Sequence, residues 1–170
     1  KIKEKINLHS QNYRVLALAH SENNFENGKI PKGVQLMAFI LIKDKIRYNA
    51  EKTLNFFRKQ GVDIKIISGD SPITVSKIAQ RVKLQNADSY VDATTLKSDD
   101  EINKAAIKYT IFGRVTPAQK QKIIKALQSN GHTVAMVGDG VNDVLAMKES
   151  DCSVAMASGS DIARNIAHLV

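Results

Sequence analysis

Apolar and polar positions change their spacing several times along the chain, and each change predicts a new element. Apolar residues are nearly continuous over residues 34–42, which is typical of a strand covered on both faces. Over residues 47–60 the apolar positions fall at helical spacing, and Gly61 follows where a helix would end. Strands and helices then alternate to the last residue, which indicates βαβ units and a parallel sheet.

The other predicted elements are short and are separated by polar turns. Strands are expected at residues 13–19, 62–67, 110–112, 133–137 and 152–156, and helices at 72–82, 101–108, 118–129, from 142 and from 161. Residues 21–32 are polar, contain glycine and proline, and are expected to form a loop or hairpin connection. A change of pattern after residue 42 predicts a boundary between residues 1–42 and residues 43–170.

The composition limits the kinds of partner that this chain could bind. The chain has 170 residues, of which 43% are hydrophobic, and no apolar run approaches the roughly 20 residues that a membrane-spanning helix needs. Its net charge is +8, but the basic residues are dispersed and only 5% of residues are aromatic, so stacking platforms for nucleic acid are poor. We therefore expect a phosphate-bearing ligand and no nucleic acid. The single cysteine favours a reducing, cytosolic setting.

The most informative turn is GDGVND, at residues 138–143, directly after a predicted buried strand. It offers the carboxylates of Asp139 and Asp143 and the amide of Asn142 at the place where ligands bind in open α/β sheets. Mg²⁺ is held by one or two such carboxylates, with water and phosphate completing its shell. The structural alternative is turn formation and capping of the next helix by the same residues.

Two further strand ends carry polar groups. Ser68, Gly69 and Asp70 precede a helix, where a hydroxyl and backbone N–H groups could cradle phosphate oxygens; the alternative is a simple helix-capping turn. Arg114 precedes a helix whose first turn carries Lys120, a cation that could neutralise a phosphate; the alternative is a solvated lysine. Because strands of a parallel sheet end at one edge, we expect these turns to converge.

Asp44 and Arg47 flank the start of the first predicted helix. Standing alone, they are explained by an acid that complements the helix dipole and by an ion pair three residues apart.

Six segments in order resemble P-type cation-transporting ATPases, a family within the haloacid dehalogenase superfamily of aspartyl-phosphate enzymes. They are residues 14–19 (RVLALA, the last strand of the nucleotide-binding domain), 44–47 (DKIR for DPxR), 68–70 (SGD for TGD), 114–120 (RVTPAQK for RVxPxxK), 138–143 (the GDGVND hinge motif) and 155–160 (AMASGS for AMGSG). Lysine replaces proline at position 45, serine replaces threonine at 68, and alanine replaces the first glycine at 157.

The resemblance implies a three-layer, Rossmann-like haloacid dehalogenase core with a mostly parallel sheet. Residues 1–42 would be the remnant of a nucleotide-binding domain with its connecting strand, and residues 43–170 the C-terminal part of a phosphorylation domain. The parent protein would be an ATP-driven pump in the cell membrane that uses Mg²⁺ and ATP, with this segment on its cytoplasmic side.

The resemblance also implies roles around the phosphoryl group. Asp139 would bind Mg²⁺, with Asp143 as the second candidate ligand and as the residue that orients the loop and the lysine. Asn142 would hydrogen-bond the phosphoryl group, and Lys120 would neutralise its charge.

Other implied roles concern the remaining phosphate contacts and the nucleotide. Ser68 and the Gly69 N–H would bind phosphoryl oxygens, and Arg14 would reach the phosphates of ATP. Four further residues would contact the nucleotide or couple the two cytosolic domains, namely Asp70, Asp44, Arg47 and Arg114.

The family's nucleophile, the aspartate of DKTGT, is absent. Residues 92–96 (DATTL) imitate it but lack its glycine and follow the Ser68 turn instead of preceding it, so we interpret them as unrelated. We expect a fragment that forms no aspartyl phosphate alone and that lacks the DKTGT segment and the nucleotide-binding, actuator and membrane domains.

In the family the missing strand lies between the strands that end near Ser68 and Gly138, so its loss would leave unpaired edges. Collapse, strand exchange with a second copy or pairing with a separate segment would close the gap. Two other functions remain open. A soluble haloacid dehalogenase-type phosphatase would need a strand ending in Asp-x-Asp, which the chain lacks. A regulatory receiver-like module would not need Lys120, Ser68 and Asp139 to converge.

Overall fold

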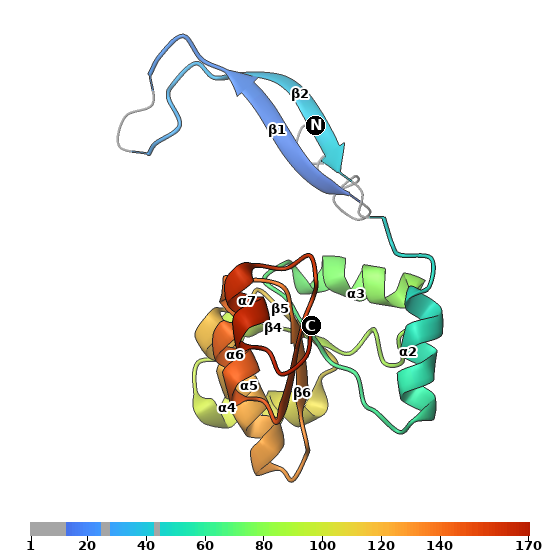
Figure 1. Cartoon of the computed structure of the whole chain (residues 1–170). Helices are drawn as coiled ribbons and strands as arrows, with labels where there is room; N and C mark the ends of the chain where they lie inside the picture. The colour runs from blue at the N-terminus through green and yellow to red at the C-terminus, as the bar shows by residue number, and fades with distance from the viewer. Residues whose placement is uncertain (1–12, 25–27, 43–44) are drawn as a thin grey trace. The chain divides into compact units, whose positions relative to one another are not determined.

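The computed structural model describes residues 13–24, 28–42 and 45–170, and the chain forms two compact units, Lys1–Tyr48 and Asn49–Val170 (Figure 1). The first unit contains β1 (Arg14–His20) and β2 (Gln35–Ile42), which pair antiparallel from Arg14 opposite Ile42 to His20 opposite Gln35. The register shifts between Leu18 and Ala19, so the hairpin contains an irregularity there.

The expectation that residues 34–42 form a strand covered on both faces is wrong. Seven of the eight residues of β2 are exposed, and Met37 reaches 65%. The reason is that, among the described strands, β2 pairs with β1 alone, and a two-stranded ribbon has no second layer to cover it. Continuous hydrophobicity predicted a strand correctly, but it did not predict whether a layer packs on it.

The second unit alternates helices and strands, as the spacing predicted. Its elements are α2 (Ala50–Lys59), β3 (Ile66–Ile67), α3 (Pro72–Arg81), β4 (Tyr90–Asp92), η1 (Ala93–Thr95), α4 (Asp99–Lys108), β5 (Ile111–Gly113), α5 (Pro117–Ser129), β6 (Ala135–Gly138), η2 (Val141–Asp143), α6 (Val144–Glu149), β7 (Cys152–Ala155) and α7 (Asp161–Ile166). The short strand β4 and the turn η1 were not predicted, and β3 is shorter than expected.

All strands of this unit that pair do so in parallel, which confirms the predicted sheet type. One sheet has the order β3-β5-β4, with Ile67 beside Phe112 and Asp92 beside Gly113. The other joins β6 to β7. Among the described residues no ladder joins β3 to β6, so each keeps one edge without a partner strand.

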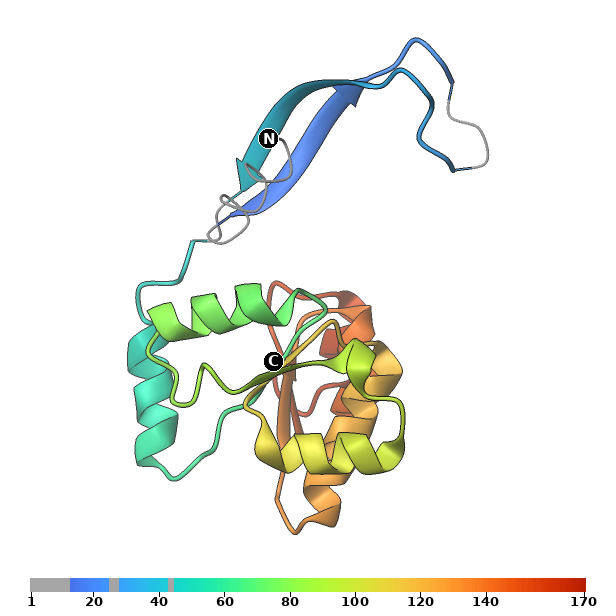
Figure 2. The same cartoon turned by 180° about the vertical axis from the view of Figure 1, so that it is seen from behind.

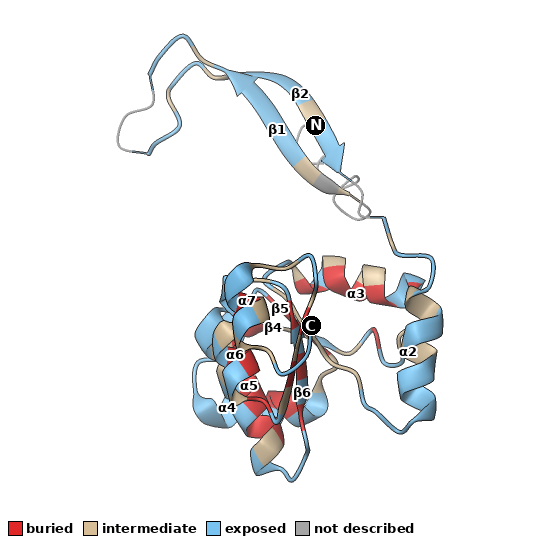
Figure 3. Ribbon diagram, viewed as in Figure 1, coloured by how far each residue is buried: buried red, intermediate tan, exposed pale blue. Residues whose placement is uncertain are grey.

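Strand β5 is fully buried because it lies between two apolar layers. Successive residues of a strand face opposite sides, and here Ile111 packs with Val75 and Ala79 of α3 while Phe112 packs with Ile123 of α5. Helices α4, α5, α6 and α7 pack against one another in sequence order, and α3 packs on β4 and β5 (Figures 1 and 2). The buried residues accordingly face the centre of this unit (Figure 3).

The layered arrangement of parallel strands and helices agrees with the expected Rossmann-like core. No helix in the described part of the chain has both the length and the apolar character to cross a bilayer.

Candidate functional site

The turn after β6 is folded around the carboxylate of Asp143. The Oδ2 atom of Asp143 accepts hydrogen bonds from the backbone N–H groups of Asp139 (3.2 Å) and Gly140 (3.3 Å). Strand β6 ends at Gly138, where an added Cβ would lie 2.6 Å from the Cβ of Asp143. Glycine at this position therefore lets the carboxylate fold back under the turn.

Lys120 reaches the same carboxylate from α5. Its Nζ atom lies 2.5 Å from Oδ1 of Asp143, and the two side chains are only 11% and 9% exposed. Burial raises the pKa of Asp143, but the Lys120 ammonium and the two backbone N–H donors together lower it by more, so the pKa lies below the usual range. Lys120 is therefore a buried partner of an ionised carboxylate and not a solvated surface lysine.

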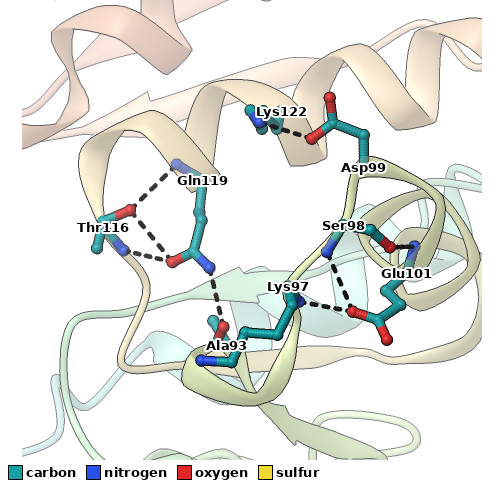
Figure 4. A network of polar contacts seen from close by, with 8 residues as sticks. All are labelled: Ala93, Lys97, Ser98, Asp99, Glu101, Thr116, Gln119 and Lys122. Atoms are coloured by element: carbon teal, nitrogen blue, oxygen red, sulfur yellow. Dashed lines mark hydrogen bonds and ion pairs between the residues drawn. The ribbon is translucent and has the colours of Figure 1, made fainter.

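A network of hydrogen bonds around Thr116 and Gln119 holds the start of α5 (Figure 4). Lys120 follows in the same turn of this helix. Thr116 caps the helix: its Oγ1 accepts from Gln119 N (3.3 Å), while Gln119 Oε1 accepts from Thr116 N (3.1 Å). The amide Nε2 of Gln119 donates to the carbonyl of the buried Ala93 (2.8 Å). We did not single out Gln119 from the sequence, although the spacing Thr-x-x-Gln before a helix is a capping-box signal.

Asp139 and Asn142 are exposed, unlike Asp143. The backbone beneath Asp139 is fixed from the β7 side, because its carbonyl accepts from Ser160 N (2.8 Å) and an added Cβ on Gly159 would lie 2.7 Å from that carbonyl oxygen. A rigid backbone therefore carries an accessible carboxylate and an accessible amide.

The Ser68 turn after β3 is attached to the connection between β5 and α5. The carbonyl of Ser68 accepts from Val115 N (3.0 Å), and the carbonyl of Asp70 accepts from Arg114 N (2.8 Å). Within the turn, Asp70 N donates to Ser68 Oγ (3.1 Å). Nothing lies within 4 Å of a Cβ built on Gly69, so space is open beside its backbone.

The predicted site residues therefore form two groups, the Ser68 turn and the Lys120–Asp143 pair, and the segment at residues 114–120 contacts both. The Ser68 carbonyl bonds the N–H of Val115, and further along the same segment Lys120 contacts Asp143. Arg114 makes an ion pair with Asp92 (2.7 Å).

The residues expected near the nucleotide are only partly described. Arg47 is exposed and belongs to the first unit, before α2. Asp44 and the side chain of Arg14 lie outside the described residues.

A magnesium ion fits the chemistry of the β6 turn. In the described ranges no three His, Cys, Asp or Glu side chains are grouped to enclose a metal. Mg²⁺, however, keeps waters and is commonly held by one or two carboxylates together with the phosphate of a substrate. Exposed Asp139 would be one such ligand, and Asp143 follows in the same turn.

The fold and the positions of these turns place the chain in a class of proteins, the α/β domains whose polar site residues lie at the carboxyl ends of parallel strands. Residues 6–151 match the family model of the haloacid dehalogenase-like hydrolases, and the chain belongs to that family.

Curated relatives confirm the resemblance to P-type cation-transporting ATPases. The chain is 48% identical over 159 residues to the probable cation-transporting ATPase exp7 of Streptococcus pneumoniae, covering 92% of this chain and 20% of that protein. It is 43% identical over 162 residues to the calcium-transporting ATPase CtpE of Mycobacterium tuberculosis, covering 95% of this chain and 20% of that protein. The chain thus spans about a fifth of these relatives.

A solved structure agrees with the fold. The catalytic domain of the CPx-ATPase CopB-B superposes with a TM-score of 0.58 at 28% sequence identity, covering 86% of this chain and 48% of that one.

Proposed function

We propose that this chain is part of the cytoplasmic catalytic region of an ATP-driven cation pump in a membrane, and that it binds Mg²⁺ and the phosphoryl group of an aspartyl phosphate. The observation that carries the proposal is the buried pair of Lys120 and Asp143 in the turn that bears exposed Asp139. A surface turn with only a capping role has no need of a lysine brought in from another helix and buried against it.

Lys120 supplies fixed positive charge. An ammonium has three donors, and one of them is directed to Asp143 Oδ1. In our proposal another donor contacts a phosphoryl oxygen, with Asp143 holding the lysine charged and oriented. Donors fixed before the reaction stabilise developing charge without reorganising, which is how most of phosphoryl-transfer catalysis arises.

The opposite side of the phosphoryl group is assigned to the Ser68 turn. The Ser68 hydroxyl and the Gly69 N–H, beside open space, would donate to phosphoryl oxygens. Asn142, exposed on the β6 turn, would donate to a third oxygen.

Asp139 would hold Mg²⁺ through its exposed carboxylate, and Asp143 is the second candidate ligand. When bound, the ion neutralises charge on phosphoryl oxygens and on the carboxylate that they modify. Arg14 is assigned to the phosphates of ATP. Contacts to the nucleotide, or coupling of the two cytosolic domains, are assigned to Asp70, Arg114, Arg47 and Asp44.

The nucleophilic aspartate would come from a DKTGT segment outside this chain. Its strand would pair with the free edges of β3 and β6, because these two strands have no described partner between them. The parent's nucleotide-binding, actuator and membrane domains would be further partners. Strand exchange with a second copy is the alternative way to cover the same edges.

Labelling with γ-³²P-ATP and Mg²⁺ tests the proposal. The isolated chain should take up no acid-stable label, whereas the full-length pump containing it should form a phosphoenzyme. Asp139→Ala in the pump should abolish the phosphoenzyme.

The matched control is Lys148→Ala, which changes an exposed residue on the neighbouring helix α6 and should leave phosphoenzyme formation intact. Normal phosphoenzyme in Asp139→Ala refutes the metal role. Hydrolysis of a phosphate ester by the isolated chain would instead support a soluble phosphatase.

A further inference from the structure

The turn at residues 92–95, which imitates the nucleophile motif, connects both halves of the proposed phosphoryl site. Asp92 is the last residue of β4, and η1 follows it directly. Each oxygen of its carboxylate has a separate partner: Oδ1 accepts from Thr94 N (3.0 Å) and Thr94 Oγ1 (2.7 Å), and Oδ2 accepts from Arg114 Nη1 (2.7 Å). Hydrogen bonds from Thr94, helped by Arg114, hold the pKa of Asp92 below its usual range.

The first connection runs through Arg114 to the Ser68 turn. Arg114 has a φ of 54°, in the left-handed region that non-glycine residues rarely adopt. In this conformation its N–H donates to Asp70 O (2.8 Å), and the next N–H, of Val115, donates to Ser68 O (3.0 Å). The ion pair with Asp92 fixes the side chain of the residue that carries this backbone strain.

The second connection runs through Ala93 to Lys120. The carbonyl of Ala93 accepts from Gln119 Nε2 at 2.8 Å (Figure 4). Gln119 directly precedes Lys120 in the first turn of α5. Ala93 is fully buried, so this carbonyl is a fixed point. The turn therefore contacts the residue that shapes one proposed phosphate-binding loop and the residue next to the proposed phosphate-binding lysine.

We infer that Asp92 and Gln119 are positioning residues that hold the Ser68 turn and Lys120 in the register needed to bind one phosphoryl group together. Neither residue contacts the phosphoryl group itself. The inference rests on the proposed function, since it assigns to that site the element that aligns its two sides.

Hydrogen exchange in the isolated chain tests the first connection without reference to phosphate. Asp92→Ala should speed exchange of the Arg114 and Val115 amides about fivefold, the effect expected from losing the Asp92 bond to Arg114, which is one of the three bonds that this carboxylate accepts. The matched control is Asp99→Ala, which removes an ion pair of similar length, to Lys122 at 2.6 Å, from a more exposed carboxylate. Equal exchange at Arg114 and Val115 in both variants overturns the first connection. If Asp92→Ala does not fold, Asp92→Ser keeps an oxygen for Thr94 but cannot reach Arg114.

Vanadate, a phosphate mimic, tests the alignment in the full-length pump. Asp92→Ala and Gln119→Ala should each raise the half-inhibitory vanadate concentration about fivefold in pumps that remain folded at the assay temperature, as circular dichroism checks. Asp99→Ala and Gln121→Ala should not, because Gln121 bonds Glu149 away from the turn. If Lys120→Ala weakens vanadate inhibition while the Asp92 and Gln119 variants leave it unchanged, only the positioning role fails.

If Lys120→Ala itself leaves vanadate inhibition unchanged, the proposed function fails instead.

A double variant, Asp92→Ala with Arg114→Met, tests the contact between these two residues. Two residues that act through one contact produce less than the sum of their separate effects. Fully additive effects contradict the assignment of Asp92 to Arg114.

Discussion

The ammonium of Lys120 lies 2.5 Å from the carboxylate of Asp143, and these two residues, 23 apart in the chain, join α5 to the turn after β6. Lys120→Met should lower the free energy of unfolding by about 3 kcal/mol, because it leaves a buried carboxylate without its countercharge. Lys122→Met is the control: its ion pair with Asp99 is exposed, so the loss should stay under about 1 kcal/mol. Urea unfolding measures both, and equal losses would contradict the assigned burial.

The same pair predicts how stability depends on pH. Because the pKa of folded Asp143 is depressed, the carboxylate stabilises the fold fully above about pH 4, the ordinary value in an unfolded chain. That contribution disappears as the pH falls from there through the depressed pKa of the folded state. Asp143→Asn should therefore flatten the decline of the unfolding free energy below about pH 4. Parallel curves for the two proteins would contradict this prediction.

Gly138 should not tolerate a side chain. A Cβ there would lie 2.6 Å from the Cβ of Asp143 and 2.9 Å from the sulfur of Met147, so Gly138→Ala should cost about 1–3 kcal/mol of stability. Gly69→Ala is the matched control, since its Cβ would meet nothing within 4 Å. Thermal unfolding distinguishes them, and equal midpoints would show that the β6 turn relaxes freely.

The two serines that precede helices should differ in their contribution to stability. Ser98 caps α4 through Oγ, which accepts from Glu101 N (3.2 Å), whereas Ser71 before α3 makes no side-chain capping bond. Ser98→Ala should lower the unfolding free energy by about 1 kcal/mol. Ser71→Ala should change it much less, as urea unfolding of both variants would measure. A similar loss from both would mean that the Ser98 bond contributes nothing.

Local signals in the sequence predicted most elements of the second unit. Pro117 marked the first residue of α5, and the apolar run before residue 138 marked β6, although the strand begins at Ala135. Strand β4 was not predicted because it has only three residues and follows a polar stretch, so its sequence shows no alternation of apolar and polar positions. It forms because it pairs with buried β5, a contact that depends on the fold and not on the local sequence.

The site was predictable in its residue types but not in its partners. The turn at residues 138–143 indicated a carboxylate site from its position after an apolar strand. That Asp143 is the buried carboxylate and Asp139 the exposed one depends on how the turn folds around Gly138. Likewise, Arg114 could not be paired with Asp92 from the sequence, because β4 was not predicted and the left-handed conformation of Arg114 leaves no local pattern.

Gly113 restricts how this sequence can diverge. A Cβ on Gly113 would lie 2.3 Å from the backbone nitrogen of Pro72, a contact that no side-chain rotation relieves. Another residue could therefore replace Gly113 only if the backbone at Pro72 moved, and this shift would change both the Ser68 turn and the start of α3. An invariant glycine at this position among related chains would therefore follow from packing alone and would not by itself be evidence of a functional role.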